Sequence, residues 1–122
     1  MTRFQTLLAL AQEELDTADL LWQNDRYRAC ISRSYYEMYH ATQALLSLKN
    51  IQTKTHRGTI QAFGQHYIKT GELPIEMARH LSEAYDFRQL SDYEELISPS
   101  KQQAAIILQN ARAFISQLSS VQ

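Results

Sequence analysis

Apolar residues recur at the start of the chain with the spacing of an amphipathic helix. Between residues 3 and 23 they return every three or four positions, so they share one face of a helix. The stripe consists of Phe4, Leu8, Ala11, Leu15, Ala18 and Trp22. The pattern predicts a first helix over roughly residues 3–23 that packs this face into a bundle.

A second helical pattern follows a short polar break. Asn24 and Asp25 are suited to the break and to an N-cap, after which Tyr27 to Leu48 can form a helix of about six turns. Its predicted core face consists of Ile31, Ser34, Met38, Ala41, Leu45 and Leu48. The chain has one cysteine, Cys30, without a partner thiol, and we expect it to be a buried free thiol in this helix.

The third pattern is shorter and contains two glycines. Thr55 can cap a helix that ends at Gly71, while Gly58 and Gly64 weaken it. Its apolar positions are Ile60, Phe63, Tyr67 and Ile68. We expect this segment to form the short helix of the fold.

Two further helices are predicted after proline residues. Pro74 suits the first turn of a fourth helix ending near Tyr93, and Ser98 with Pro99 suits the N-cap and first turn of a fifth. The inward positions of the fourth are Ala78, Leu81, Ala84, Tyr85 and Arg88. Those of the fifth are Ala104, Ile107, Leu108, Ala111, Ile115 and Leu118.

These segments together predict an all-α fold. Three glycines and two prolines in the whole chain favour long helices over a β fold with its many turns. Antiparallel packing with short connections would bury every apolar stripe. We therefore expect an up-down antiparallel four-helix bundle with an additional short helix, forming a single domain over residues 1–122.

Charge and hydropathy exclude several classes of protein. A net charge of −1 argues against a protein that coats nucleic acid with a broad basic face, although one compact site for a phosphate-bearing ligand stays possible. No apolar run is long enough to span a bilayer, and the N-terminus lacks a signal-peptide core. We expect a cytoplasmic protein without membrane contact.

The most informative polar residues lie on the predicted second helix. Arg33 and His40 are two turns apart, so they differ by about 20° in direction and lie roughly 10 Å apart along the axis. Arginine matches phosphate oxygens and histidine exchanges protons near neutral pH, which is the minimum for metal-free RNA cleavage. Glu37 lies between them and can pair with Arg33, so a solvated charged face is the alternative reading.

Other residues near this pair are candidates for ligand contact. Tyr36 and Tyr39 follow Arg33 on the helix and either stack on a base or pack ordinarily. His56 and Arg57 begin the predicted third helix, where backbone N–H groups favour an anion, although surface placement is the simpler reading.

Arg88 is best explained as structural. It falls on the apolar stripe of its helix with Asp92 one turn later, which indicates a partly buried ion pair at the helix end. The chain has no His-Glu-x-x-His, paired-cysteine or glycine-rich nucleotide motif. We expect no metal and no cofactor.

The stretch from Ser32 to Ala41 resembles the signature helix of the HEPN domain family, with its pattern R-x-Y-Y-x-M-[FY]-H-A. Lys54-Thr55-His56-Arg57-Gly58, and Arg88 with Asp92-Tyr93, are similar to the same subgroup of small prokaryotic proteins. The resemblance implies a helical bundle, often a homodimer, in which Arg33 and His40 of both subunits line a shared cleft. We expect Arg88, Asp92 and Tyr93 to have structural roles.

The resemblance also implies a choice of functions. Many members are metal-independent endoribonucleases, among them toxins encoded beside a small nucleotidyltransferase antitoxin, and others bind a nucleotide or a partner without cleavage. A catalytic role is implied for Arg33 and His40, with RNA contacts around them. Active members usually carry Asn, Asp or His directly after the arginine, where this chain has Ser34. A ribonuclease toxin, a non-catalytic nucleotide- or nucleotidyltransferase-binding module and a simple adaptor therefore remain as hypotheses.

Overall fold

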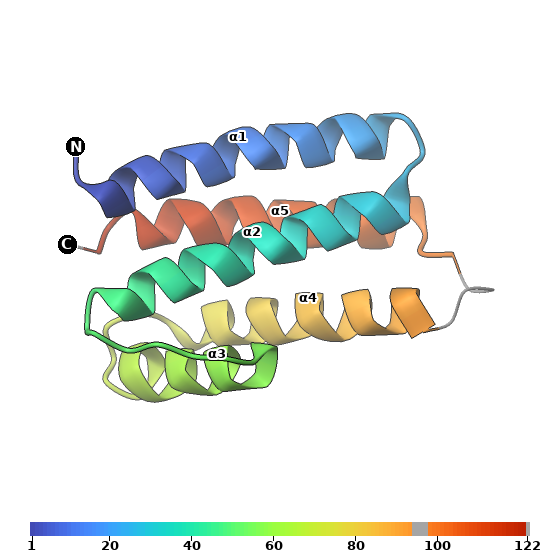
Figure 1. Cartoon of the computed structure of the whole chain (residues 1–122). Coiled ribbons are helices and arrows are strands. Elements are labelled where there is room, and N and C mark those ends of the chain that lie inside the picture. The colour runs from blue at the N-terminus through green and yellow to red at the C-terminus, as the bar shows by residue number, and fades with distance from the viewer. Residues whose placement is uncertain (94–97, 122) are drawn as a thin grey trace.

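The computed structural model describes residues 1–93 and 98–121, and of Asp92 and Tyr93 it describes the backbone alone. Its helices are α1 (Arg3–Gln23), α2 (Tyr27–Ser47), α3 (His56–Phe63), the π-helical turn η1 (Gly64–Ile68), α4 (Ile75–Tyr93) and α5 (Lys101–Leu118). The four long helices run alternately up and down, α3 lies against α2 and α4, and both termini are at one end (Figure 1). The predicted all-α four-helix bundle with a short additional helix is confirmed.

The helix starts follow from capping chemistry. Thr2 and Gln5 form a reciprocal capping box at α1, and Thr55 accepts the Gly58 N–H at α3 as predicted. The predicted start of the fifth helix is wrong, because the N-cap is Ser100 and not Ser98. The residue three positions after Ser98 is a lysine, which cannot accept the cap N–H, whereas Gln103 accepts it from Ser100 at 2.8 Å.

The connection between α1 and α2 also differs from the prediction. Asp25 has φ +62° and is no N-cap, because Arg26 precedes α2 and makes no side-chain cap bond. Aspartate tolerates this left-handed conformation, which reverses the chain within a few residues. The Asp25 carboxylate accepts the Tyr27 hydroxyl at 2.8 Å instead.

The third predicted helix is divided in two. The α-helix ends at Phe63, the chain widens into η1, and Gly71 with φ +80° lies just beyond it. Tyr67 in the wide turn is buried, and its hydroxyl donates to the Leu45 carbonyl of α2 at 3.0 Å. This buried bond fixes the short helical segment to the bundle.

The core lies where the predicted stripes meet, with α2 in contact with α1, α3, α4 and α5. Cys30 is fully buried as expected, and burial raises the pKa of its thiol to about 11, so it stays protonated.

Leu48 was predicted in the core but is 45% exposed, because α2 ends at Ser47 and the chain turns away there. Trp22 is half-buried, and its indole N–H donates to the Lys101 carbonyl at 2.9 Å.

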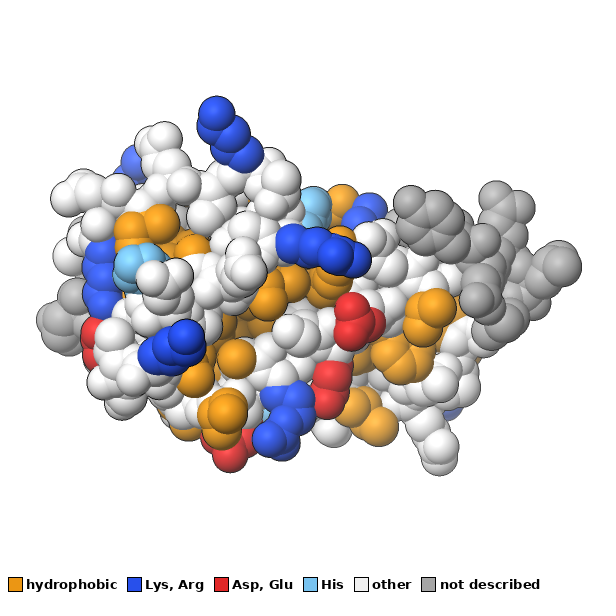
Figure 2. Space-filling model, turned by 90° about the horizontal axis from the view of Figure 1, so that it is seen from below, with side chains coloured by type: hydrophobic (Ala, Val, Ile, Leu, Met, Phe, Trp, Pro, Cys, Tyr) orange, Lys and Arg blue, Asp and Glu red, His pale blue; other side chains and the backbone are white. Residues whose placement is uncertain are grey.

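The face formed by α3 and α4 carries side chains of both charges. Viewed from the side of α3 and α4, basic and acidic side chains are interspersed with separate apolar patches (Figure 2). Within residues 1–93 and 98–121, no helix combines the length and the apolar character needed to cross a membrane.

Candidate functional site

A cavity of about 560 Å³ lies along the outward face of α2. Arg33 and His40 both line it, with Glu37 between them, so the structure brings these three predicted site residues together. Tyr36 forms part of the wall. The remaining lining residues are Leu21, Ala29 and Ser32.

Arg33 is oriented by a residue that the sequence did not indicate. Its Nη1 donates to Oε2 of Glu14 on α1 at 2.6 Å. The alternative reading of the sequence paired Arg33 with Glu37, one turn along α2, but among the described residues the ion pair of Arg33 is the one with Glu14. The antiparallel packing of α1 against α2 brings the two side chains together.

The Arg33–Glu14 pair is accessible to solvent. The two side chains are 43% and 45% exposed, and ion pairs at such positions contribute about 0–1 kcal/mol. A ligand phosphate can therefore replace the carboxylate at little cost. It carries more negative charge, and two of its oxygens can accept hydrogen bonds from the planar guanidinium of Arg33 as a carboxylate does.

Glu37 adds a second carboxylate to the cavity. Burial and the nearby Glu14 charge raise the pKa of Glu37, while His40 and Arg33 lower it to a smaller extent. Its carboxyl group is consequently a better proton acceptor than a fully solvated glutamate.

The Tyr36 ring in the wall of the cavity contacts both α2 and α4. The ring of Tyr36 stacks near His40, with centroids 5.9 Å apart and planes 23° from parallel. The guanidinium carbon of Arg88 lies 4.7 Å from the centroid of the same Tyr36 ring. Arg88 thus touches a wall residue of the cavity, while its predicted pair with Asp92, and any role of Tyr93, fall on side chains outside the described residues.

Tyr39, His56 and Arg57 do not line the cavity. The His56 ring stacks on Tyr39 with centroids 4.2 Å apart, and its Nδ1 lies 2.5 Å from the hydroxyl of the buried Tyr35. Arg57 is exposed on the next position of α3. His56 and Tyr39 thus make packing contacts with each other, and the ligand contacts of Tyr39, His56 and Arg57 stay predictions.

Comparison with known proteins identifies the family of the chain. The model of the HEPN domain matches residues 4–121, which is nearly the whole chain. The chain belongs to the HEPN domain family. The resemblance to this family that the sequence analysis found is confirmed.

Individual relatives agree over most of their length. The chain is 33% identical to "Putative toxin MJ0142" of Methanocaldococcus jannaschii over 112 residues, which are 92% of this chain and 76% of that protein. A second protein of that organism, "Putative toxin MJ0605", is 32% identical, with 93% and 84% covered. The UPF0332 protein glr0978 of Gloeobacter violaceus is 40% identical, with 88% and 87% covered.

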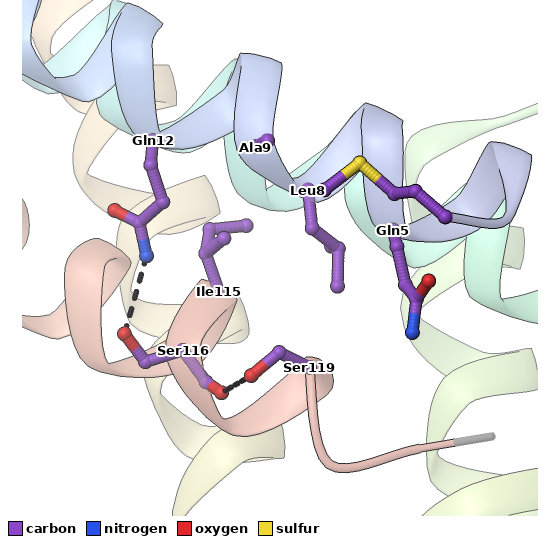
Figure 3. A pocket seen from close by; sticks show the side chains of 8 residues that line it. Gln5, Leu8, Ala9, Gln12, Ile115, Ser116 and Ser119 are labelled. Carbon is purple, nitrogen blue, oxygen red and sulfur yellow. Dashed lines mark hydrogen bonds between the residues drawn. The ribbon is translucent and has the colours of Figure 1, made fainter.

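This HEPN domain has another hollow with different chemistry. Its volume is about 450 Å³, and it lies between α1 and α5 with Leu8, Ala9 and Ile115 among its walls (Figure 3). Gln12 donates to the Ser116 hydroxyl across it at 3.2 Å. Its walls contain no Lys, Arg or His side chain, so it offers an anionic ligand far less than the α2 cavity does.

Potential metal ligands are scattered in the part of the chain that the structure describes. Within it, no group of three or more His, Cys, Asp or Glu side chains could hold a metal ion.

The stability of this HEPN domain is expected to decrease below about pH 6.5 because of His56. Burial, with smaller contributions from the positive charges of Arg88 and His40, lowers the pKa of His56 below its ordinary 6.5. The unfolded chain therefore binds the proton more readily, so the stabilisation is complete above about pH 6.5 and is lost as pH falls through the lower folded-state pKa.

Thermal unfolding of the wild type and of His56→Asn between pH 7.5 and 5 measures this effect. Asparagine can still accept the Tyr35 hydroxyl but does not titrate. The melting temperature of the wild type should decrease more steeply than that of the variant. Parallel curves would show that His56 does not set the pH dependence.

Proposed function

We propose that this HEPN protein is a toxin that cleaves RNA without a metal ion, as a homodimer, and that a small nucleotidyltransferase acts as its antitoxin in the cytoplasm. The observation that carries the proposal is one cavity on α2 with a guanidinium and an imidazole in its wall. The names of two relatives, "Putative toxin MJ0142" and "Putative toxin MJ0605", support the toxin part of the proposal.

The proposed chemistry uses these two groups and the RNA itself. His40 accepts the proton of a ribose 2′-hydroxyl, whose oxygen attacks the adjacent phosphorus as the bond to the 5′-oxygen breaks. Arg33 stabilises the negative charge that develops on the phosphoryl oxygens. The products are a 2′,3′-cyclic phosphate and a 5′-hydroxyl end.

A dimer would complete this reaction. The 5′-oxygen must gain a proton as it leaves, and one imidazole that has just accepted a proton is not placed on both sides of the phosphorus. A twofold axis through the α2 face supplies a second copy of His40 as the acid. It also supplies a second Arg33, which increases the positive charge around the phosphate.

Incubation of the purified full chain with total RNA in excess EDTA tests the proposal. We expect fragments that end in 2′,3′-cyclic phosphate and begin with 5′-hydroxyl, together with growth arrest when the chain is induced in cells. Coexpression of a nucleotidyltransferase encoded beside it should relieve the arrest. Intact RNA after incubation with a verified dimer would refute cleavage.

A second candidate is a non-catalytic HEPN module that binds a nucleotide or the nucleotidyltransferase. One observation favours it: Ser34, which follows the arginine, is fully buried and does not line the cavity. Nucleotide binding that depends on Arg33, without any fragments of RNA, would identify this function instead.

A further inference from the structure

A third hollow adjoins the α2 cavity and shares His40 with it. Its volume is about 410 Å³, within the range of pockets for small ligands. Like the first, it lies along α2, but toward the opposite end of the helix and against the start of α1. It is lined by Arg3, Phe4, Leu7, His40, Gln43, Ala44, Ser47 and Leu48.

The lining combines apolar surface with a polar edge. Phe4, Leu7 and Leu48 supply apolar surface, and Leu48 is 45% exposed although it is a large hydrophobic residue. Arg3 adds an exposed cation at the first turn of α1. A ligand that is apolar on its faces, polar at its edge and attached to negative charge matches this surface.

Gln43 provides a polar group whose orientation is fixed. Its Nε2 donates to the Tyr39 hydroxyl at 3.1 Å, and Tyr39 is itself held by its stack on His56. The carbonyl Oε1 of Gln43 forms no hydrogen bond with the described residues, so it can accept one from a ligand N–H. An oriented acceptor beside apolar walls is the arrangement that reads the edge of an unstacked base.

We propose that this hollow binds the base of a nucleotide next to the cleaved phosphate, and that Gln43 selects the base by accepting a hydrogen bond from its edge. The inference rests on the proposed phosphate site, because His40 lies in the wall of both hollows. A phosphate at Arg33 and a base beside Gln43 then belong to one continuous strand of single-stranded RNA. The hollow sets base preference, whereas Arg33 binds every phosphate alike.

Titration of the full chain with the four ribonucleoside 3′-monophosphates and with inorganic phosphate, followed by NMR, tests this proposal. We expect the wild type to prefer some bases over others. Gln43→Leu should reduce that preference by about two- to tenfold, which corresponds to one hydrogen bond, and should leave inorganic phosphate binding unchanged. Gln109→Leu is the matched control, because Gln109 is exposed on α5 and lines none of the hollows described above.

The same titrations separate this proposal from ribonuclease activity. Base preference that depends on Gln43, in a protein that does not cleave RNA, would retain the base site and refute cleavage. Cleavage with an unchanged base preference in Gln43→Leu would retain the ribonuclease and overturn the base site. A change of dimer content in Gln43→Leu by analytical ultracentrifugation would also overturn it, because the hollow would then be a subunit contact.

Discussion

RNA cleavage by the Arg33→Ala and His40→Ala variants is expected to be about 10²- to 10⁴-fold slower than that by the wild type. Loss of a general acid or base typically has an effect of this size, and so does loss of a fixed group that stabilises charge in the transition state. The rate of cyclic-phosphate formation on a defined oligoribonucleotide measures the change. Because both residues act on the same phosphate, the double variant should be hardly slower than either single variant.

Matched variants show whether these losses are specific. Arg112 of α5 resembles Arg33, since it forms an ion pair with Asp16 of α1 at 2.8 Å and its side chain is 37% exposed. Arg112→Ala should therefore match Arg33→Ala in stability but keep wild-type cleavage. His80→Ala is the corresponding control for His40, because His80 lies on α4 and lines neither α2 hollow. Cleavage within about threefold of wild type in Arg33→Ala would exclude its proposed role.

Replacement of Tyr35 by alanine is expected to lower the free energy of unfolding by about 3–5 kcal/mol. The Tyr35 ring is fully buried and contacts aromatic rings from three helices. These neighbours are Tyr36, Tyr39, His56 and Tyr85. Alanine would leave a cavity among them and release α3, which is held to α2 partly through His56. Urea denaturation at pH 7.5 measures the change.

Two conservative variants separate the ring of Tyr35 from its hydroxyl. Tyr35→Phe keeps the ring but leaves Nδ1 of His56 without its bond, which should cost about 1–3 kcal/mol. Tyr27→Phe removes an exposed bond to Asp25, and its effect should stay within about 0.5 kcal/mol. Equal effects of these two variants would show that the Tyr35–His56 contact does not contribute to stability.

Local spacing determined most of the fold. Five of the six residues predicted for the first helix stripe are buried, because helical periodicity is a property of consecutive residues. The predictions failed at three helix ends, at Asp25, Ser98 and Leu48, where the outcome depends on competing caps and on the path of the following turn. Leu48 illustrates this, because one residue beyond the end of α2 was enough to expose it.

The shared face of Arg33, Glu37 and His40 was likewise determined by the sequence alone, since seven residues make two turns of any α-helix. Tertiary structure decided what surrounds them. Glu14 reaches Arg33 from α1, and Arg88 reaches Tyr36 from α4, across sequence separations for which no local pattern exists. The hollow beside Gln43 also has walls from two helices. Helical periodicity therefore determines which residues of α2 share a face, and the packing of neighbouring helices determines which residues contact them.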